Sequence, residues 1–351
     1  MTMQEPVEGR AETVHPMTGI GIIVNPKHAP THRSYAVLTA GLRRLRMRYR
    51  TMTTTESRSG RWQAEQLLAW GAETIILLGG DGTIRAAAPV LAEAGVLTFL
   101  IPTGTANVLS RHVGISSARE AIDHCLHTLP LTADPKPGHR PSNQAGKHAD
   151  TMTVVSAAAT NHGRSIPINT VEARGADGSW TRHDFISLAG IGGDARAVAH
   201  HHRAPGLLGY AWGAARALFA ADLASQTRRA VEASAPESMW SMMASKVARP
   251  AGPISVFPDA RIDDAEFSVL RVGPLPRGTA RRFLAWGGIA SACLQGRPAQ
   301  SPFMHYRRSA SATVKLTRPA PAQVDGDLIG DCLELRVSAG ESRLWVSAPP
   351  S

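Results

Sequence analysis

The sequence has few cysteines and no long apolar run among its 351 residues. The three cysteines lie far apart, without the paired spacing of a zinc site or a disulfide framework: Cys125, Cys293 and Cys332. A reducing compartment such as the cytoplasm is therefore expected. The best apolar stretch, residues 284–294, covers about half of a membrane-spanning helix, so no such helix is predicted. The first residues include Glu5, Glu8 and Arg10 and have no apolar core, so no signal peptide is expected.

Aromatic residues and acidic charge are also scarce. Aromatic side chains make up 5% of the chain and barely alternate with basic ones, so we expect no stacking platform for nucleic acid. Lys and Arg outnumber Asp and Glu by 38 to 28, and the net charge of +10 favours an anionic partner, such as a nucleotide or an acidic membrane face. The densest basic cluster, residues 43–50, is either a contact for such a partner or the solvated end of a helix.

The length predicts two domains. We expect a loose tail over 1–17, an α/β domain over 18–132, a proline- and glycine-rich linker or long loop over 133–150 and a β-rich domain over 151–351.

Strand-like and helix-like segments alternate in the first domain, which predicts a parallel sheet with helices on both faces. The expected strands are 20–24, 49–54, 74–78 and 98–101, and the expected helices are 34–47, 61–70, 84–94 and 118–129.

The second domain is dominated by short strand-like runs with two inserted helices, over 207–224 and 276–294. A glycine-rich turn at 175–178 predicts a hairpin. The expected strands are 152–155, 167–173, 183–189, 254–257, 267–272, 313–316, 333–337 and 343–347.

Glycine-rich loops follow two successive strands of the predicted parallel sheet. The first is Gly79, Gly80, Asp81, Gly82 and Thr83, and the second is Pro102, Thr103, Gly104, Thr105, Ala106 and Asn107. Such a loop either packs tightly between strand and helix or lets backbone N–H groups approach a phosphate beside a helix N-terminus. Two such loops open at the same edge of a parallel sheet, which favours phosphate binding. Asn25 and Pro26 end the first strand at that edge.

Two common nucleotide-binding motifs are missing from the sequence. The chain has neither the lysine-containing Walker sequence nor a GxGxxG motif that opens a helix behind the first strand. Their absence argues against a P-loop NTPase and an ordinary dehydrogenase.

Five motifs in this order resemble the diacylglycerol kinase catalytic family, which includes bacterial lipid kinases and is related to sphingosine and ceramide kinases. They are NP at 25–26, GGDGT at 79–83, PTGTAN at 102–107, GIGGDA at 190–195 and DGD at 325–327. The resemblance covers roughly residues 19–347. It implies an ATP-binding α/β domain and a β-sandwich-like second domain that contributes the acceptor side of the cleft.

The resemblance also implies an activity. The chain would be an ATP- and Mg²⁺-dependent kinase of a lipid hydroxyl, with diacylglycerol as the favoured acceptor and an anionic membrane face as a peripheral partner. It would lie in the cytoplasm, at the inner membrane face, and a homodimer is compatible with the family.

The family's nucleotide-binding positions fall on residues of the N-terminal domain. They are Asn25, Pro26, Thr55, Gly79, Gly80, Asp81, Gly82, Thr83, Thr103, Gly104, Thr105 and Asn107. The resemblance gives Asp81 the role of orienting Mg²⁺. It gives Asp327 the role of proton acceptor, although the family has Glu there, one methylene longer.

The family also holds a structural Mg²⁺ through an aspartate side chain and nearby main-chain oxygens. These positions fall on Asp264, Arg261 and Glu266, although the usual DDGLLDV reads DDAEFSV at 263–269. Two further departures are Ala86 in place of a common Glu, and an insertion over 140–165.

Three alternatives share parts of this pattern. A sphingoid or ceramide kinase shares every motif, because the choice of lipid depends on the shape of the cleft. An NAD kinase shares GGDGT but not PTGTAN or the long strand-rich second half. A catalytically degenerate member that binds nucleotide or lipid is suggested by Asp327 and by the altered 263–269 segment.

Overall fold

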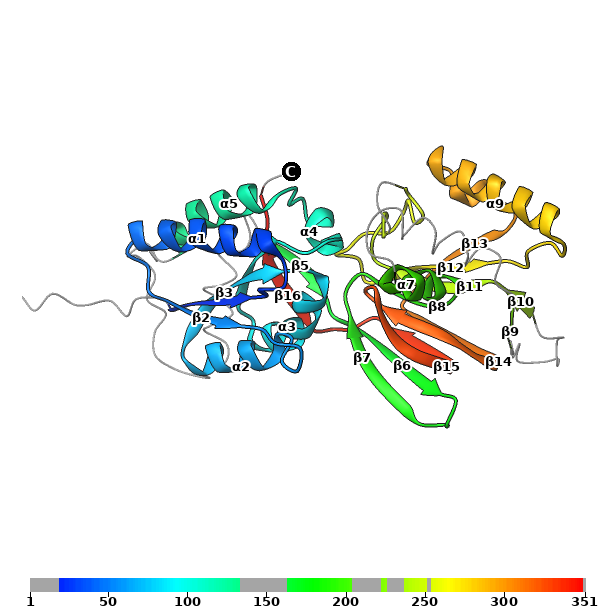
Figure 1. Ribbon diagram of the computed structural model, residues 1–351, viewed down its shortest axis with the longest axis horizontal. Coiled ribbons are helices and arrows are strands. Elements are labelled where there is room, and N and C mark those ends of the chain that lie inside the picture. Colours follow the sequence, from blue (N-terminus) through cyan, green and yellow to red (C-terminus); the bar gives the residue numbers. More distant parts are fainter. Residues whose placement is uncertain (1–18, 133–162, 204–221, 226–236, 251–253, 350–351) are drawn as a thin grey trace, which may run out of the picture.

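The computed structural model describes residues 19–132, 163–203, 222–225, 237–250 and 254–349. These residues form an α/β domain and a β-rich domain that lie side by side (Figure 1). The predicted tail over 1–17, the linker over 133–150, the strand over 152–155 and residues 207–221 of the predicted 207–224 helix lie outside the described residues. The end of that helix, Leu223 and Ala224, lies in a short strand instead.

The first domain is built on a six-stranded sheet with the order β2-β1-β3-β4-β16-β5. All neighbouring strands are parallel except β16 and β5. The strands are β1 Gly19–Val24, β2 Tyr49–Thr53, β3 Ala72–Gly79, β4 Leu97–Pro102, β5 Gly163–Pro167 and β16 Arg343–Ser347. All six residues of β1 are buried, as expected of a parallel strand that is covered on both faces.

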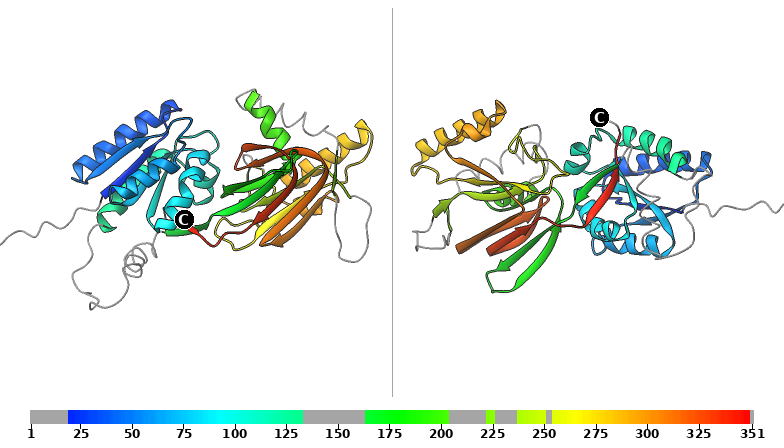
Figure 2. Two further views of the ribbon diagram at one scale, coloured as in Figure 1. Left: turned by 90° about the horizontal axis from the view of Figure 1, so that it is seen from below. Right: turned by 180° about the vertical axis from the view of Figure 1, so that it is seen from behind.

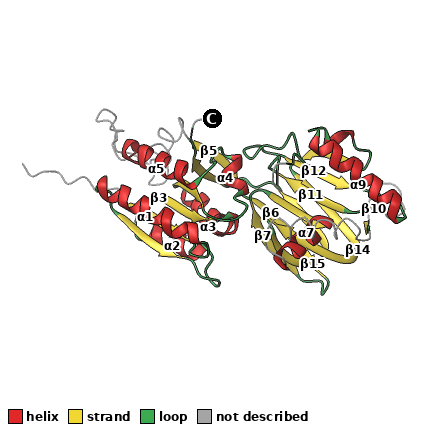
Figure 3. Ribbon diagram, turned by 45° about the horizontal axis from the view of Figure 1, so that its top comes forward, coloured by secondary structure: helices red, strands yellow, loops and turns green. Residues whose placement is uncertain are grey.

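Helices cover both faces of this sheet (Figure 3). Contacts between α1 and α5 form one layer, and contacts between α2 and α3 form the other. The helices are α1 Ala29–Arg44, α2 Arg61–Ala69, α3 Asp81–Ala94, α4 Val108–His112 and α5 Ala118–Thr132. Among the described helices, none combines the length and the apolar character that crossing a membrane requires.

The second domain is a ten-stranded antiparallel sheet in which eight strands follow the order β13-β12-β11-β8-β14-β15-β6-β7. Its strands are β6 Asn169–Gly175, β7 Trp180–Phe185, β8 Leu188–Gly192, β9 Leu223–Ser225, β10 Glu237–Met239, β11 Ser241–Ser245, β12 Phe267–Val272, β13 Met304–Ser309, β14 Ser311–Val324 and β15 Asp327–Ser338. Helix α7, Gly193–Arg203, packs against β8, β14 and β15. Helix α9, Thr279–Leu294, and the short 3₁₀ helix Pro298–Gln300 follow β12.

The predicted fold class is confirmed, with differences in detail. Strands β5 and β16, which the sequence places in the second domain, pair within the first sheet, so the chain returns to its first domain at the end (Figure 2). The predicted strand at 254–257 is not formed. The strands and α-helices that were not predicted are β5, β9, β10, β11, β13, α4 and α7. Apart from 207–224, the predicted helices match α1, α2, α3, α5 and α9 within five residues at each end.

Candidate active site

The two glycine loops lie in direct contact. They follow the neighbouring strands β3 and β4, and the Thr103 N–H donates to the Gly79 carbonyl at 3.1 Å. A Cβ atom added to Gly104 would lie 2.6 Å from the Cα atom of Gly80, closer than real Cβ contacts allow. Glycine is therefore required here because the two backbones approach each other too closely for any side chain.

Asp81 joins the first loop to the helix behind the second. Its two carboxylate oxygens accept hydrogen bonds from the Val108 and Leu109 N–H groups, both at 3.0 Å, at the start of α4. These N–H groups have no partner within a helix, so the carboxylate caps them. Asp81 is therefore a positioning residue in this arrangement, and its role toward Mg²⁺ remains a prediction.

Asn107 closes the second loop on itself. Its side-chain oxygen accepts from the Gly104 N–H at 3.1 Å, and its side-chain amide donates to the Gly104 carbonyl at 2.7 Å. Asn107 has a φ of 46°, a left-handed conformation that Asn tolerates better than most residues. The predicted ligand Asn107 thus holds the shape of the loop.

Asn25 ties the end of β1 to the first loop. Its side-chain amide donates to Thr83 Oγ1 at 2.9 Å. The chain runs from β1 to β2 on one side and from β3 to β4 on the other, so the strand order reverses between β1 and β3. Ligands bind at such a switch point in open parallel sheets, and Asn25 and Gly79 lie at the ends of the two strands that flank it.

The remaining predicted nucleotide ligands differ in exposure. Thr83 and Thr103 are buried, and Thr103 Oγ1 has no hydrogen-bond partner among the described residues. Pro26, Thr55 and Thr105 are exposed. Helix α3 begins at Asp81, so the backbone of the first loop is also the N-terminus of a 14-residue helix, where an anion is stabilised.

Asp327 comes from the second domain and lies against this helix N-terminus. A Cβ atom added to Gly82 would lie 3.6 Å from Asp327 Oδ2. The same carboxylate forms an ion pair with Arg85 Nη2 of α3. Arg85 was not predicted as a site residue, because only the contact between the domains gives it a partner. Its Nε atom is buried and has no hydrogen-bond partner among the described residues.

Asp325 fixes the turn that carries Asp327. Its buried carboxylate accepts hydrogen bonds from the N–H groups of Ile186, Ser187 and Leu188, at 2.7–2.9 Å. Burial raises the pKa of Asp325 to about 6, and the backbone donors offset part of that rise.

A second network of side-chain hydrogen bonds supports the same turn. Gln323 accepts from the Gly326 N–H at 2.9 Å and donates to Asp194 Oδ2 at 3.0 Å. Asp194 also accepts from Ser241 Oγ, and burial raises the pKa of its carboxyl. Asp194 belongs to the GIGGDA motif, and a Cβ atom at Gly190 would overlap it at 2.0 Å. That motif therefore supports the turn that carries Asp327.

A second contact joins the domains beside α4. His112 Nε2 accepts from the Arg249 N–H at 3.2 Å, and His112 Nδ1 lies 2.8 Å from the Val108 carbonyl. These two bonds require the neutral imidazole with its proton on Nδ1. Burial lowers the pKa of His112, which favours that neutral form.

The predicted structural Mg²⁺ does not fit the residues present. The buried Lys246 ammonium donates to the carbonyls of Asp264 and Glu266, at 2.6 and 3.1 Å. The side chain of Arg308 pairs with both carboxylates of Asp264 and Glu266. Cationic side chains thus occupy two of the three predicted oxygen ligands, the Asp264 carboxylate and the Glu266 carbonyl. No cluster of metal-binding side chains occurs in the described part of the chain. The metal prediction for Arg261, Asp264 and Glu266 is not supported.

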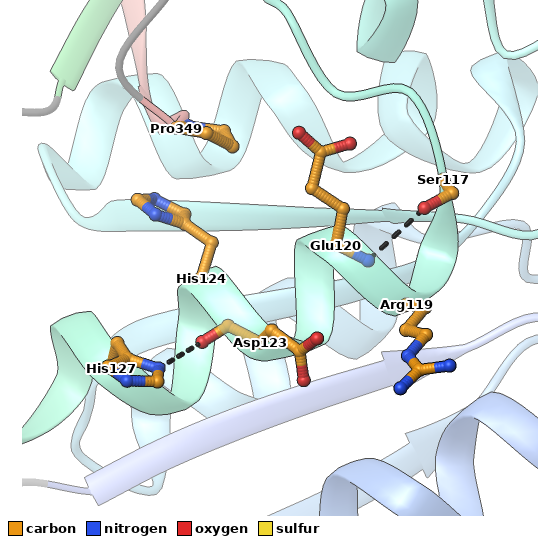
Figure 4. A pocket seen from close by; sticks show the side chains of 7 residues that line it. All are labelled: Ser117, Arg119, Glu120, Asp123, His124, His127 and Pro349. Atoms are coloured by element: carbon orange, nitrogen blue, oxygen red, sulfur yellow. Dashed lines mark hydrogen bonds between the residues drawn. The ribbon is translucent and has the colours of Figure 1, made fainter.

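A cavity of about 530 Å³ lies away from the glycine loops, beside α5 (Figure 4). It is lined by Ser117, Arg119, Glu120, Asp123, His124, His127 and Pro349. His124 Nε2 also lies 2.9 Å from Ser347 Oγ of β16, so this cavity lies where α5 packs against the last strand. None of its residues belongs to the predicted site.

Comparison with known proteins agrees with the motifs. The family model described as the diacylglycerol kinase catalytic domain matches residues 20–135. Residues 20–135 are therefore similar to a diacylglycerol kinase catalytic domain, which supports the predicted family. At the level of the family this indicates a lipid kinase. No curated protein matches the sequence.

Solved structures share the fold of both domains. A diacylglycerol kinase from Bacillus anthracis str. Sterne is 13% identical, with a TM-score of 0.55, and the match covers 95% of this chain and 97% of that one. A candidate diacylglycerol kinase from the same organism is 15% identical, with a TM-score of 0.62, over 95% and 98% of the two chains. At these identities the likeness establishes the fold alone.

Proposed function

We propose that the protein is an ATP- and Mg²⁺-dependent lipid kinase that transfers the γ-phosphate of ATP to a lipid hydroxyl, with diacylglycerol as the favoured acceptor. One observation carries this proposal: the Asp327 carboxylate lies against the N-terminus of α3, where the two glycine loops meet. A carboxylate so close to an anion-binding helix end suits a base that acts on a group attacking the phosphate.

The N-terminal domain would hold the nucleotide. Backbone N–H groups of residues 80–82 and the partial positive charge of the α3 N-terminus would bind phosphate oxygens. Thr103, whose buried Oγ1 lacks a partner among the described residues, supplies a further hydrogen-bonding group there. Mg²⁺ bound with ATP would neutralise charge on the phosphate oxygens.

Asp327 would accept the proton of the lipid hydroxyl. As that proton leaves, the hydroxyl oxygen forms a bond to the γ-phosphorus, the bond between that phosphorus and the bridging oxygen of the β-phosphate breaks, and ADP departs. Aspartate reaches less far than the family's glutamate. The turn at Asp325 and Gln323 holds its backbone firmly, so the shorter side chain lies at a fixed place.

Arg85 would balance the charge of this base. A free carboxylate beside a triphosphate would repel it, because like charges a few ångströms apart raise the energy of the complex. The Arg85 guanidinium pairs with Asp327 across the domain boundary and lies one helical turn behind the glycine loop. It thereby lets base and phosphate share one site.

The direct test is incubation of the purified protein with γ-labelled ATP, Mg²⁺ and a panel of lipids, followed by thin-layer separation. Label in phosphatidic acid is the expected result. Label in a sphingoid or ceramide phosphate would show that the lipid acceptor is not diacylglycerol, and it would leave the assignment of the site residues unchanged. ATP binding by calorimetry without transfer to any lipid or to NAD would support the degenerate alternative and contradict the proposal.

A further inference from the structure

Helix α9 exposes an apolar face. Phe283, Leu284 and Leu294 are 67%, 73% and 73% exposed. Phe283, Gly287, Ala290 and Leu294 follow one another at offsets of four, three and four residues, so they share one side of the helix, and Leu284 lies next to Phe283. Figure 1 shows α9 at the outer surface of the second domain, far from the first.

The opposite face of α9 is apolar as well. Ala285, Ile289 and Cys293 are buried and pack in a core cluster with Trp240 and Phe257. A helix that is apolar on both sides needs a partner on each, because an exposed apolar patch of this kind marks an interaction site. Within the described residues, the sheet covers only the inner side.

The segment of the chain that carries this face is basic. From Phe267 to Val324 the sequence contains no Asp or Glu, whereas it contains nine Lys or Arg residues. Arg277 and Arg281 lie exposed at the start of α9, and Arg297 lies exposed just beyond its end. Arg282, by contrast, is paired with Asp222. The apolar face is therefore flanked by basic side chains at both ends.

The basic charge beside the apolar face distinguishes between two possible partners, a second copy of this chain and an anionic membrane. A symmetric contact between two copies through α9 would bring the same arginines of both copies together, with no acidic residue in this segment to neutralise them. An anionic lipid surface supplies the missing negative charge and also accepts apolar side chains. Charge complementarity therefore favours a membrane.

We propose that α9 is the membrane-docking helix of this protein: Phe283, Leu284 and Leu294 insert among the lipids, while Arg277, Arg281 and Arg297 bind anionic headgroups. This inference rests on the proposed function only in its choice of a lipid partner, since membrane binding requires neither ATP nor turnover. It places the docking surface on the second domain, the one that supplies Asp327.

Vesicle sedimentation with the full-length protein tests this inference. The two vesicle compositions are phosphatidylcholine alone and phosphatidylcholine with an equal amount of phosphatidylglycerol. We expect binding to the anionic vesicles and much weaker binding to the neutral ones. The double variant Phe283→Ser/Leu284→Ser should weaken binding by about tenfold or more, because it removes two apolar side chains from the lipid contact. Arg281→Glu should weaken it by roughly fivefold or more.

Two exposed residues of the first domain provide matched controls. Val37→Ser on α1 and Arg119→Glu on α5 make the same kinds of change away from α9 and should leave binding within about twofold of wild type. Circular dichroism and melting temperature show whether each variant is folded.

Three results would overturn the inference. They are unchanged vesicle binding in the folded α9 variants, equal loss in the controls, or conversion of a dimer to a monomer by Phe283→Ser/Leu284→Ser without effect on vesicle binding. Docking that persists in a protein without kinase activity would disprove the proposed function and leave this inference standing.

Discussion

At the scale of single residues, the glycines of the two loops have different reasons to be glycine. Gly104 lies against the backbone of Gly80, whereas Gly82 has only the Asp327 carboxylate at ordinary contact distance. We predict that Gly104→Ala destabilises the fold by about 1–3 kcal/mol, because backbone must move to admit the methyl group. Gly82→Ala should keep or raise stability, since Ala favours a helix by about 1 kcal/mol.

Kinase activity should respond differently to the Gly82 change. The added methyl group would lie between the α3 N-terminus and Asp327, so Gly82→Ala is expected to lower phosphoryl transfer in a stable protein. Thermal melting and the transfer assay measure the two effects. A stable Gly104→Ala protein would contradict the close approach of the loops.

His112 gives the contact between the domains a dependence on pH. Burial lowers its pKa below 6.5, so between the folded pKa and 6.5 the unfolded chain binds more protons than the folded one. Stability should therefore fall as the pH falls through that window. His112→Gln, which does not titrate, should reduce this slope in melting temperatures measured from about pH 7.5 to about pH 5.5. The pKa of His183 is also lowered, so some slope should remain. An unchanged slope in His112→Gln would show that titratable groups other than His112 cause the pH dependence of stability.

At the scale of structural elements, Lys246 directly follows β11 and joins the end of this strand to the 261–266 loop by hydrogen bonds. Its ammonium satisfies two carbonyls and lies 4.7 Å from the centroid of the Phe267 ring. Lys246→Met keeps the length but removes both hydrogen bonds, and we predict a loss of about 2 kcal/mol or more. The exposed Lys27→Met serves as the matched control and should change stability by less than about 0.5 kcal/mol.

Because of these contacts of Lys246, we predict that Mg²⁺ does not change the thermal stability of the protein. Without nucleotide, the wild-type protein should melt at the same temperature in EDTA and in Mg²⁺, because Lys246 and Arg308 already occupy two of the three predicted oxygen ligands. A clear rise in melting temperature with Mg²⁺ would restore the metal site.

Most elements could be predicted from sequence where their signals are local. The alternation of apolar runs and glycine turns located β1 to β4, and apolar spacing located α5. The sequence pattern did not predict the position of a strand in a sheet where its partners lie far away along the chain. Residues 343–347 read as a strand, but only tertiary packing places β16 between β4 and β5.

The candidate site was predictable to a similar extent. Asn25 and the glycine loops follow from motif and topology. The pairing of Arg85 with Asp327, the capping role of Asp81 and the insertion of Lys246 depend on which side chains meet after folding. No pattern of neighbouring residues carries that information.

At the scale of the whole molecule, Arg85 and Asp327 connect the two domains at the site. Arg85→Ala should lower kcat by roughly tenfold to a hundredfold, with a smaller change in the KM for ATP, because it removes positive charge where the phosphate reacts. Arg85→Lys should recover part of the loss. Arg61→Ala removes an exposed arginine paired with Glu65 and should leave kcat near wild type. Equal activity of Arg85→Ala and wild type would remove Arg85 from the mechanism.

The measurement that tests the central claim most directly is phosphoryl transfer from γ-labelled ATP to diacylglycerol by wild type, Asp327→Asn and Asp331→Asn. Asp331 is an exposed carboxylate further along the same strand, β15. We predict that wild type and Asp331→Asn form labelled phosphatidic acid at similar rates, while Asp327→Asn is slower by about 10²–10⁴-fold, as expected for loss of a general base. Full activity of a folded Asp327→Asn protein would contradict the account.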